Sequence, residues 1–187
     1  MEHIKTKLQN AVIIQPKVIG DNRGWFMESY SKCKFMQLGL NIDFVQDNRS
    51  FSQHKGTLRG LHCQKAPMAQ AKLVSCVRGS MMDVIVDIRK GSPSYLQWIA
   101  VELSEINKKM LFVPKGFLHG FVTLTDNVEI NYKVDECYSP ENDRSIRFDD
   151  AVFGVDWNVF DPILSEKDKK APLYKDSDVE YIYSETV

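Results

Sequence analysis

Short segments with strand character recur about every 8–12 residues through the middle of this chain, and this spacing constrains the fold most strongly. The segments are rich in β-branched and aromatic residues and are separated by turn-forming residues. They read KLVSCV (72–77), MMDVIVDIRK (81–90), QWIAVEL (97–103), KKMLFVP (108–114), GFVTLT (120–125) and NVEINYKV (127–134). This pattern predicts an all-β sandwich or barrel.

Turn signals separate neighbouring segments. The first two segments are joined by Arg78-Gly79-Ser80, which predicts a hairpin between them. Within the second, the side chains from Asp83 to Ile88 follow a period of two, as in a strand with two different faces. Asp126-Asn127 predicts a turn between the last two segments.

Helical signals are confined to two places. Residues 31–40 (SKCKFMQLGL) predict a short helix with Phe35 and Leu38 on one face and a glycine at its end. Residues 161–176 (DPILSEKDKKAPLYKD) predict a turn or a short helix. We therefore expect one domain over residues 1–187, mainly β and jelly-roll-like, with short helices at its ends.

The charge balance limits the kind of partner. Of 187 residues, 24 are basic and 25 acidic, and no basic block is present, which argues against nucleic acid or a membrane surface as the main partner. The N-terminal residues lack the apolar stretch of a secretory signal, and no apolar run is long enough to span a membrane. The four cysteines show no CxxC spacing and are too few for a disulfide framework. The sequence thus predicts a cytoplasmic protein with reduced thiols, in which a few local cations can still hold a small anion.

His62 and His119 are the two histidines in strongly patterned contexts, GTLRGLHCQ and VPKGFLHGF. The plain interpretation of each is a satisfied histidine at a strand end. However, Arg59 and His62 lie three residues apart, and on a regular strand they face opposite sides. Both reach one pocket only if Gly60 bends or bulges the strand, which glycine permits. A bulge at Gly60 is therefore a checkable expectation.

The two histidine segments resemble the two motifs of the cupin jelly-roll barrel. The run from Gly56 to His62 resembles the start of the first motif, and Pro114-x-Gly116-x-x-His119 resembles the second. Many cupins hold a metal on three histidines and a glutamate, but Gln64 replaces the second histidine and no acid follows it at the expected place. Two imidazoles without a carboxylate are a poor ligand set for zinc or iron. We expect a cupin-type jelly-roll β-barrel without a metal, in which His62 is a free base.

Three further residues narrow the chemistry. Lys72 begins a strand and can stabilise negative charge on an oxygen, whereas Tyr132 lies within a strand and can deliver a proton. Together with a neutral imidazole, these groups suffice to remove and replace a proton next to a carbonyl. Each has a plainer alternative: Lys72 as a solvated lysine, Tyr132 as a packed aromatic, and Asp168 as part of the helix-capping pattern Ser165-x-x-Asp168.

Most of the chain resembles the dTDP-4-dehydrorhamnose 3,5-epimerases, which are cupin-fold enzymes. The motifs include GDNRGWFMESY, FVQDNRSFS, GTLRGLHCQ, AQAKLV, VPKGFLHGF, NYKVDECYSPE and PILSEKD, in this order. The resemblance implies that His62 removes the protons at C3 and C5 of a 4-keto sugar and that Asp168 orients it. It further implies that Lys72, with His119, stabilises the enolate oxygen at C4, and that Tyr132 returns the proton on the opposite face. No cofactor is implied, because the ketone itself accepts the electrons.

The resemblance also implies the residues that bind the nucleotide sugar. They are Arg23, Phe26, Glu28, Gln46, Asp47, Asn48, Arg59, His119, Tyr138, Asp143 and Lys167. Arg23 and Glu28 match residues that the family supplies from a partner subunit, so a homodimer with shared sites is expected. Tyr138 matches an aromatic that stacks near the thymine. Cys63, where the family usually has an aromatic residue, is expected close to the pocket without a catalytic role.

Several alternatives remain open from the residues. An epimerase acting at C3 or C5 alone, or a 3,4-ketoisomerase, would share the same barrel. A metal-dependent cupin oxygenase or isomerase is disfavoured by Gln64. A sugar-binding jelly roll without activity would not need a base, an opposed acid and a lysine together.

Overall fold

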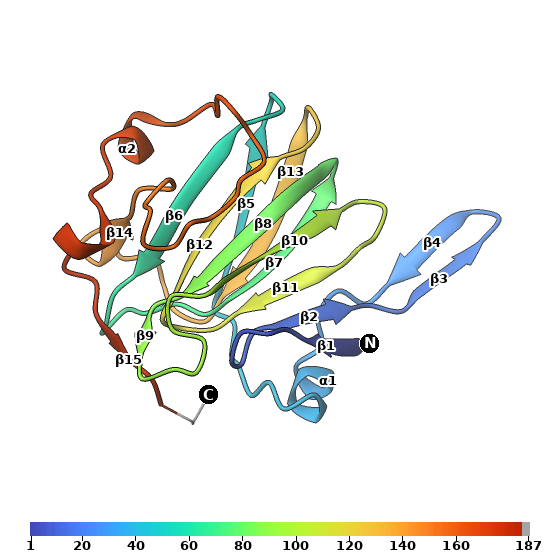
Figure 1. Ribbon diagram of the computed structural model, residues 1–187. Helices are drawn as coiled ribbons and strands as arrows, with labels where there is room; N and C mark the ends of the chain where they lie inside the picture. Colours follow the sequence, from blue (N-terminus) through green and yellow to red (C-terminus); the bar gives the residue numbers. More distant parts are fainter. Residues whose placement is uncertain (185–187) are drawn as a thin grey trace.

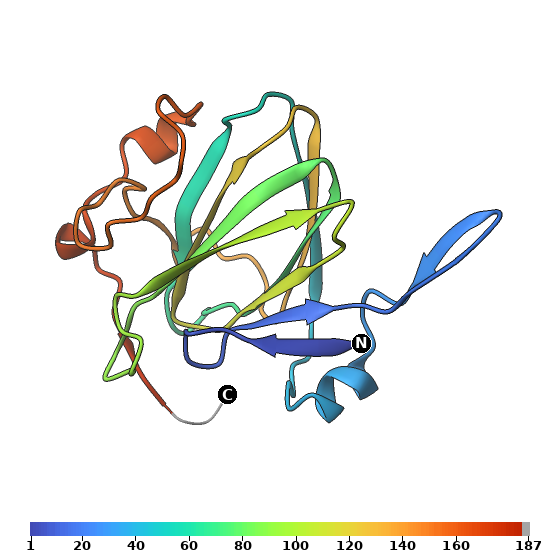
Figure 2. The same ribbon diagram turned by 45° about the vertical axis from the view of Figure 1, so that its right-hand side comes forward.

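Two antiparallel β-sheets face each other in the computed structural model, which describes residues 1–184 (Figures 1 and 2). The six-stranded sheet contains, in spatial order, β1 (Glu2–Lys5), β2 (Val12–Gln15), β11 (Met110–Val113), β7 (Lys72–Arg78), β13 (Val128–Val134) and β5 (Gln46–Ser52). The five-stranded sheet contains β10 (Trp98–Ser104), β8 (Ser80–Asp87), β12 (Phe117–Thr123), β6 (Leu58–Gln64) and β14 (Asp143–Ser145). The mainly β, jelly-roll-like fold is confirmed, although within residues 1–184 no strand pairing closes the two sheets into one barrel.

The hairpin predicted at Arg78-Gly79-Ser80 is wrong. A turn is present, but β7 pairs with β11 and β13, whereas β8 pairs with β10 and β12 in the other sheet. The chain therefore crosses from one sheet to the facing one at Gly79, whose φ is +74°. The period of two in the sequence does not show whether β7 and β8 pair in a hairpin or lie in facing sheets. In both arrangements the side chains of a strand alternate between the core face and the opposite face.

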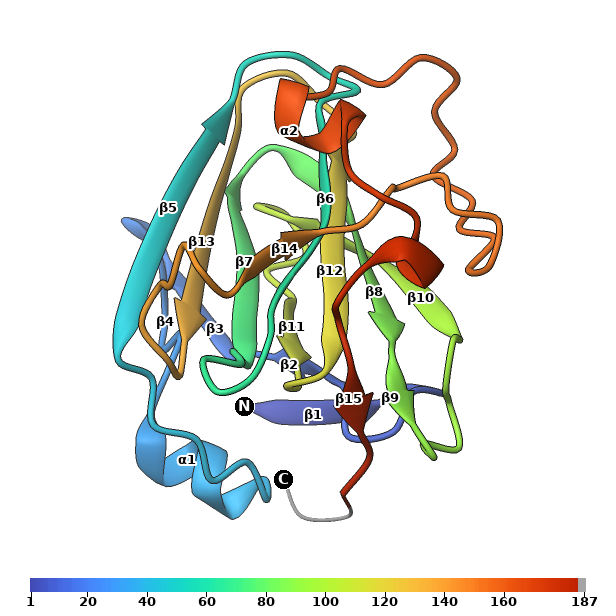
Figure 3. The same cartoon turned by 90° about the vertical axis from the view of Figure 1, so that its left-hand side faces the viewer.

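The predicted helices are confirmed as short elements at the ends of the fold. These are α1 (Lys32–Gln37), α2 (Glu166–Lys169) and the 3₁₀ turn η1 (Tyr174–Asp176). The remaining strands are β3 (Val18–Asp21), β4 (Gly24–Met27), β9 (Arg89–Lys90) and β15 (Tyr181–Ile182). The β3–β4 hairpin extends away from the two sheets, as Figure 2 shows clearly, while the C-terminal segment lies along the five-stranded sheet (Figure 3). No helix among residues 1–184 is both long and apolar enough to cross a membrane.

Three apolar clusters hold these layers together. The first fills the space between the sheets and includes Ile85 and Phe121. The second packs the C-terminal segment, including Trp157, against the outer face of the five-stranded sheet. The third packs α1, through the fully buried Phe35, against the outer face of the six-stranded sheet. Because β8 is covered on both faces, its alternation places Val84 in the second cluster and leaves Asp83 on the inner face.

The bulge expected at Gly60 is confirmed. His119 of β12 is opposite His62 of β6, but Phe121, two residues later, is opposite Arg59, so β6 contains one extra residue there. Gly60 has a φ of +131°, and a Cβ at this position would lie 2.6 Å from the Cα of Gly120. The bulge therefore lets Arg59 and His62 line the same cavity although they are three residues apart.

Candidate active site

Three of the four residues with implied catalytic roles meet where two adjoining hollows join. Both hollows are lined by His62, Lys72 and Tyr132, which come from β6, β7 and β13. The inner hollow, of about 170 Å³, is otherwise lined by Ser50, Arg59, His119, Phe121 and Ile130. The outer hollow, of about 200 Å³, is otherwise lined by Gln46, Asn48, Cys63, Gln64, Gln70, Tyr138, Asp143 and Lys167. A base that can remove a proton, a cation that can stabilise negative charge and an acid that can return a proton thus line the same cavity.

A buried carboxylate, that of Asp168, contacts the imidazole of His62. His62 Nε2 lies 2.5 Å from Asp168 Oδ1, and Asp168 is only 3% exposed. Burial would raise the pKa of Asp168, but the contacts with His62 and Ser165 outweigh it and hold that pKa below its usual value. The Asp168 carboxylate is therefore an acceptor at neutral pH and Nε2 is the donor, so the neutral imidazole has its lone pair on Nδ1.

Asp168 takes part in a helix cap as well as in the contact with His62. Its backbone N–H donates to Ser165 Oγ at 3.1 Å, which caps α2, and the same hydroxyl donates to Asp168 Oδ2 at 2.8 Å. The cap holds the remaining carboxylate oxygen toward His62. The same residue, Asp168, thus caps the short helix with its backbone N–H and contacts His62 with its carboxylate.

Burial shifts the pKa values of Lys72 and Tyr132 in opposite senses. Burial lowers the pKa of Lys72, while the nearby thiol of Cys63 and carboxyls such as Asp143 oppose that shift. Burial raises the pKa of Tyr132, against the opposing effect of Arg59. Tyr132 therefore keeps its proton well above neutral pH, as a proton donor must.

His119 has a buried carboxyl partner that the sequence reasoning missed. Its Nε2 lies 2.7 Å from Asp83 Oδ1, and Asp83 is completely buried on the inner face of β8. Asp83 Oδ2 has no hydrogen-bond partner among the described residues. The available signal was a charged residue inside the apolar run MMDVIVD, because a buried carboxyl needs a partner.

Gln64, which occupies the position of a metal ligand in other cupins, makes three hydrogen bonds to the backbone around the outer hollow. Its amide nitrogen donates to the carbonyls of Met68 and Cys137 at 2.6 and 3.2 Å, and its amide oxygen accepts from the N–H of Ser139 at 2.7 Å. These bonds hold the loop that carries Tyr138. Sequence reasoning gave Gln64 no such role.

The remaining outer residues form a connected polar rim. The hydroxyl of Tyr138 donates to Asp143 Oδ2 at 3.2 Å, and Lys167 Nζ lies 2.5 Å from the same oxygen. Gln46 donates to Asn48 at 2.7 Å and accepts from the N–H of Tyr138. Cys63 lines this hollow, as expected, and burial raises the pKa of its thiol to about 12, so it stays protonated.

Four of the implied binding residues do not line either hollow. Asp47 lies on the other face of β5, where it pairs with Lys133 at 2.8 Å. Arg23, Phe26 and Glu28 lie on or directly after the projecting β3–β4 hairpin, and Phe26 is 68% exposed. Within one chain these three side chains are separate from the site.

No group of three or more histidine, cysteine, aspartate or glutamate side chains is arranged to hold a metal within residues 1–184. His62 and His119 instead each contact one carboxyl.

A jelly roll whose cavity joins a histidine–carboxylate pair, a half-buried lysine and a protonated tyrosine belongs to the class of cupin-like acid–base isomerases. The profile of the family described as dTDP-4-dehydrorhamnose 3,5-epimerase matches residues 5–176, and the chain belongs to this family. It is 49% identical over 172 residues to the dTDP-4-dehydrorhamnose 3,5-epimerase of Salmonella typhimurium, covering 91% of this chain and 93% of that one.

Two solved structures are closely similar. The first is the dTDP-4-dehydrorhamnose 3,5-epimerase of Bacillus anthracis with TDP and PPi bound, at 46% identity and a TM-score of 0.90, covering 92% of this chain and 98% of that one. The second is the epimerase of Legionella pneumophila in complex with dTDP-4-keto-L-rhamnose, at 41% identity and a TM-score of 0.93, covering 98% and 99% of the two chains.

Proposed function

We propose that this protein catalyses epimerisation at C3 and C5 of dTDP-4-dehydro-6-deoxy-D-glucose to give dTDP-4-dehydro-L-rhamnose. The observation that carries the proposal is the meeting of His62, Lys72 and Tyr132 around one cavity in a chain of this family. The name of the Salmonella relative and the sugar nucleotide bound to the Legionella relative support the substrate class.

The first half of the reaction is removal of a proton next to the ketone. The lone pair on His62 Nδ1 takes the proton from C3 or C5, and the electrons of that C–H bond move to the C4 oxygen as an enolate. Lys72 supplies a positive charge to this oxygen, with His119 beside it. One base serves both carbons because both adjoin the same carbonyl.

The second half is return of a proton to the opposite face. Tyr132 gives its hydroxyl proton to the enolate carbon, the C4 ketone re-forms, and the configuration at that carbon is inverted. His62 is left protonated and Tyr132 ionised, so exchange with solvent resets both groups before the next turn. The Asp168 carboxylate lies against the imidazolium that forms in this step and supplies the opposite charge.

The outer hollow suits the nucleotide. A diphosphate carries negative charge. Lys167 supplies a local cation at the outer hollow and Arg59 supplies one at the adjoining inner hollow, in a chain that is nearly neutral overall. Tyr138, which is 56% exposed, offers an aromatic face at the rim for the thymine. Asn48 and Gln46 supply amides for the sugar and diphosphate oxygens.

Solvent exchange tests the reaction and its closest alternatives. The protein is incubated with dTDP-4-keto-6-deoxyglucose in deuterated water, and label at C3 and C5 is followed by NMR or mass spectrometry. Label at both carbons supports the proposal. Label at one carbon indicates a 3- or 5-epimerase or a 3,4-ketoisomerase, and a complete absence of exchange overturns all of them.

Replacing Tyr132 by phenylalanine should separate exchange from inversion. Proton removal by His62 survives in Tyr132→Phe, so deuterium still enters the substrate, whereas return from the far face loses its donor. We expect product formation to fall by about 10²-fold or more while exchange falls much less, as measured in the same NMR experiment. Equal losses of product formation and of deuterium exchange would show that Tyr132 is not the group that returns the proton.

Lys72 should set the alkaline limit of activity. Its pKa is lowered by burial, so the ammonium loses its charge below the ordinary lysine range of about 10.4. The pKa of Tyr132 is raised, so Tyr132 loses its proton at a higher pH than Lys72 does. We expect kcat/KM to decline as pH rises through the Lys72 pKa, and Lys72→Arg to move this decline to higher pH. An alkaline decline that lies at the same pH in the wild type and in Lys72→Arg would contradict the assignment.

The proposal includes a homodimer in which each site is completed by the partner's β3–β4 hairpin. The hairpin projects from the sheets with Trp25 and Phe26 exposed, which is costly for an isolated surface and suits a subunit contact. It carries Arg23, and Glu28 directly follows it, so the implied binding residues lie on an arm rather than near their own cavity. The proposal further places the enzyme in the cytoplasm, in keeping with four free cysteines.

Dilution should therefore weaken nucleotide binding. When dimers dissociate, each cavity loses the cation of the partner's hairpin, so dTDP affinity should fall as the monomer fraction rises. Calorimetric titration with dTDP, paired with sedimentation at matching concentrations, measures both. Monomers that retain full affinity would sink the shared-site proposal.

A further inference from the structure

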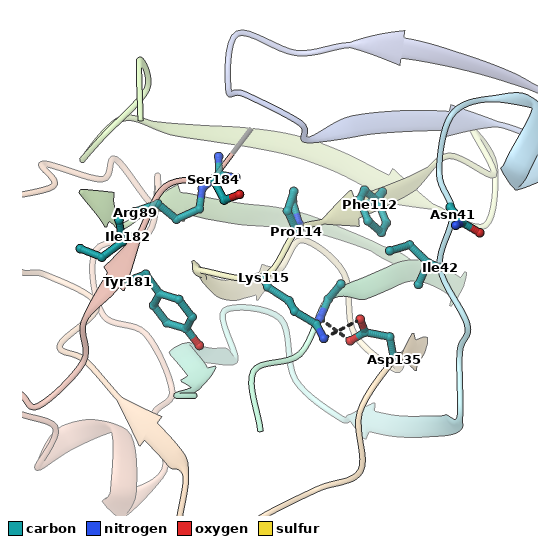
Figure 4. Close-up of a pocket in the computed structure, with 11 residues that line it drawn as sticks. Asn41, Ile42, Arg89, Phe112, Pro114, Lys115, Asp135, Tyr181, Ile182 and Ser184 are labelled. Atoms are coloured by element: carbon teal, nitrogen blue, oxygen red, sulfur yellow. Dashed lines mark hydrogen bonds and ion pairs between the residues drawn. The ribbon is translucent and has the colours of Figure 1, made fainter. Parts of the chain in front are cut away.

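A separate cavity of about 350 Å³ lies at the end of the sandwich, lined by the segment after α1 (Asn41 and Ile42) and by residues of β9 and β15 (Figure 4). Its walls are largely apolar, with Ile42 and Phe112 on one side and Pro114 and Ile182 on the other. This volume falls in the range of ligand pockets, about 300–1,000 Å³, which are typically apolar with a few converging polar groups. The cavity has the size and character of a small-molecule site.

This cavity is distinct from the two hollows that hold His62. It shares no lining residue with either of them. The segment Gln70–Lys72 forms a common wall, since Ala71 lines this cavity whereas Gln70 and Lys72 line the outer hollow. Gln70 and Ala71 lie directly before β7, so neighbouring residues at the start of this strand contact two different spaces.

One polar end of the cavity carries an accessible cation. Lys115 Nζ lies 3.0 Å from Asp135 Oδ2, and the Lys115 side chain is 49% exposed whereas that of Asp135 is 10% exposed. Asp135 Oδ1 also accepts from the N–H of Ala71 at 2.7 Å, so the carboxylate is shared between Ala71 and Lys115. An ammonium has three donors, and an anion in the cavity can bond Lys115 without displacing Asp135 from Ala71.

The second cation of the lining is already occupied. Arg89 donates to both carboxylate oxygens of Asp87 at 2.9 and 2.8 Å and stacks on the rings of Phe117 and Tyr183. It adds to the positive side of the lining but leaves one ammonium, that of Lys115, to contact a ligand. The charge pattern suits a single negative charge rather than a di- or triphosphate.

We propose that this cavity is a second ligand site, which takes a small organic monoanion with an aromatic or branched apolar body, and that its occupancy changes affinity at the catalytic cavity. The anion bonds Lys115, and the body fills the space between Phe112, Ile42 and Ile182. An occupant presses on Ala71 and on the Asp135 bond to its N–H, so it acts on the strand start that carries Lys72. Because coupling between two binding sites is reciprocal, a nucleotide bound next to Lys72 changes the affinity of this cavity by the same factor. The coupling rests on the proposed function, whereas binding of the anion does not.

The binding test uses the full chain and 1-anilinonaphthalene-8-sulfonate, a flat aromatic monoanion, as a fluorescent probe. We expect saturable binding that Lys115→Met weakens about tenfold, since a charge-assisted bond is lost. Ile182 lines the cavity but is 71% exposed, so Ile182→Trp narrows the opening with the charges kept and should also weaken probe binding. Exposed Lys17, between β2 and β3, provides the matched control Lys17→Met, which should leave affinity unchanged. Wild-type affinity in both cavity variants, or a lack of saturable binding, would overturn the site. Probe binding that disappears in Trp25→Ser would place the probe on the β3–β4 hairpin and would also overturn it.

The coupling test repeats the titration with increasing dTDP. Two linked sites change the probe affinity by a finite factor, expected to be about fivefold, which stops growing once dTDP is saturating. Displacement that grows in proportion to dTDP would mean that the probe occupies the catalytic cavity, and the proposal would be wrong. Unchanged probe affinity at saturating dTDP would remove the coupling. Failure of dTDP itself to bind would count against the proposed function, while the probe titrations of the cavity variants would still decide the second site.

Discussion

His62→Ala should lower kcat by at least about 10²–10⁴-fold, the range for loss of a positioned general base. The expectation follows from the contact between His62 Nε2 and Asp168, which leaves the lone pair of a neutral imidazole on Nδ1. Deuterium exchange at C3 and C5 should fall with turnover, because both begin with the same proton removal. This shared loss distinguishes His62 from Tyr132.

A matched histidine controls for nonspecific effects. His54 is exposed outside the cavity, so His54→Ala should retain activity. Thermal unfolding of both variants shows whether the fold is intact. Near-normal turnover in folded His62→Ala would refute its assignment as the base. Asp168→Asn should reduce turnover as well, since the amide no longer accepts from Nε2 with a full negative charge.

Gly60→Ala should destabilise the protein by about 3 kcal/mol or more, through backbone strain combined with overpacking. The new methyl would stand 2.6 Å from Gly120 Cα and 3.0 Å from the carbonyl oxygen of His119, and neither backbone atom can rotate away. The φ of +131° is also unfavourable for any residue with a Cβ. Chemical denaturation measures the loss, and failure to obtain soluble protein would be its extreme form.

Gly24 offers a control with nearly the same backbone angle. Its φ is +136°, but a Cβ there would meet nothing within 4 Å. Gly24→Ala therefore carries backbone strain alone, of about 1–3 kcal/mol at most, in a hairpin that projects from the sheets. If the two alanine variants lose equal stability, close approach of β6 and β12 is not what requires glycine at position 60.

Much of the fold was predictable because its signals are local. The strand spacing, the helix containing Phe35 and the bulge at Gly60 each follow from side-chain periodicity or from backbone freedom at one residue. The hairpin at Gly79 failed because the partner of a strand is decided by nonlocal packing. Both faces of β8 are covered, so alternation on that strand could not indicate which sheet it joins.

The site was predictable where residue type and family motif coincide, as at His62 and Tyr132. Asp168 was ambiguous in sequence because a helix cap and a histidine partner use the same carboxylate pattern. Asp83 was missed because its partner, His119, is on another strand and only the sheet pairing brings them together. Gln64 was considered only as a missing metal ligand, and its bonds to the loop before Tyr138 depend on how that loop folds.

The projecting β3–β4 hairpin has a genetic consequence. If each cavity borrows Arg23 from the other subunit, two inactive alleles can complement each other. A chain with Arg23→Ala keeps its own His62, and a chain with His62→Ala keeps an intact hairpin. A mixed dimer then contains one cavity with every group in place, so a cell expressing both alleles would regain activity that neither allele provides by itself.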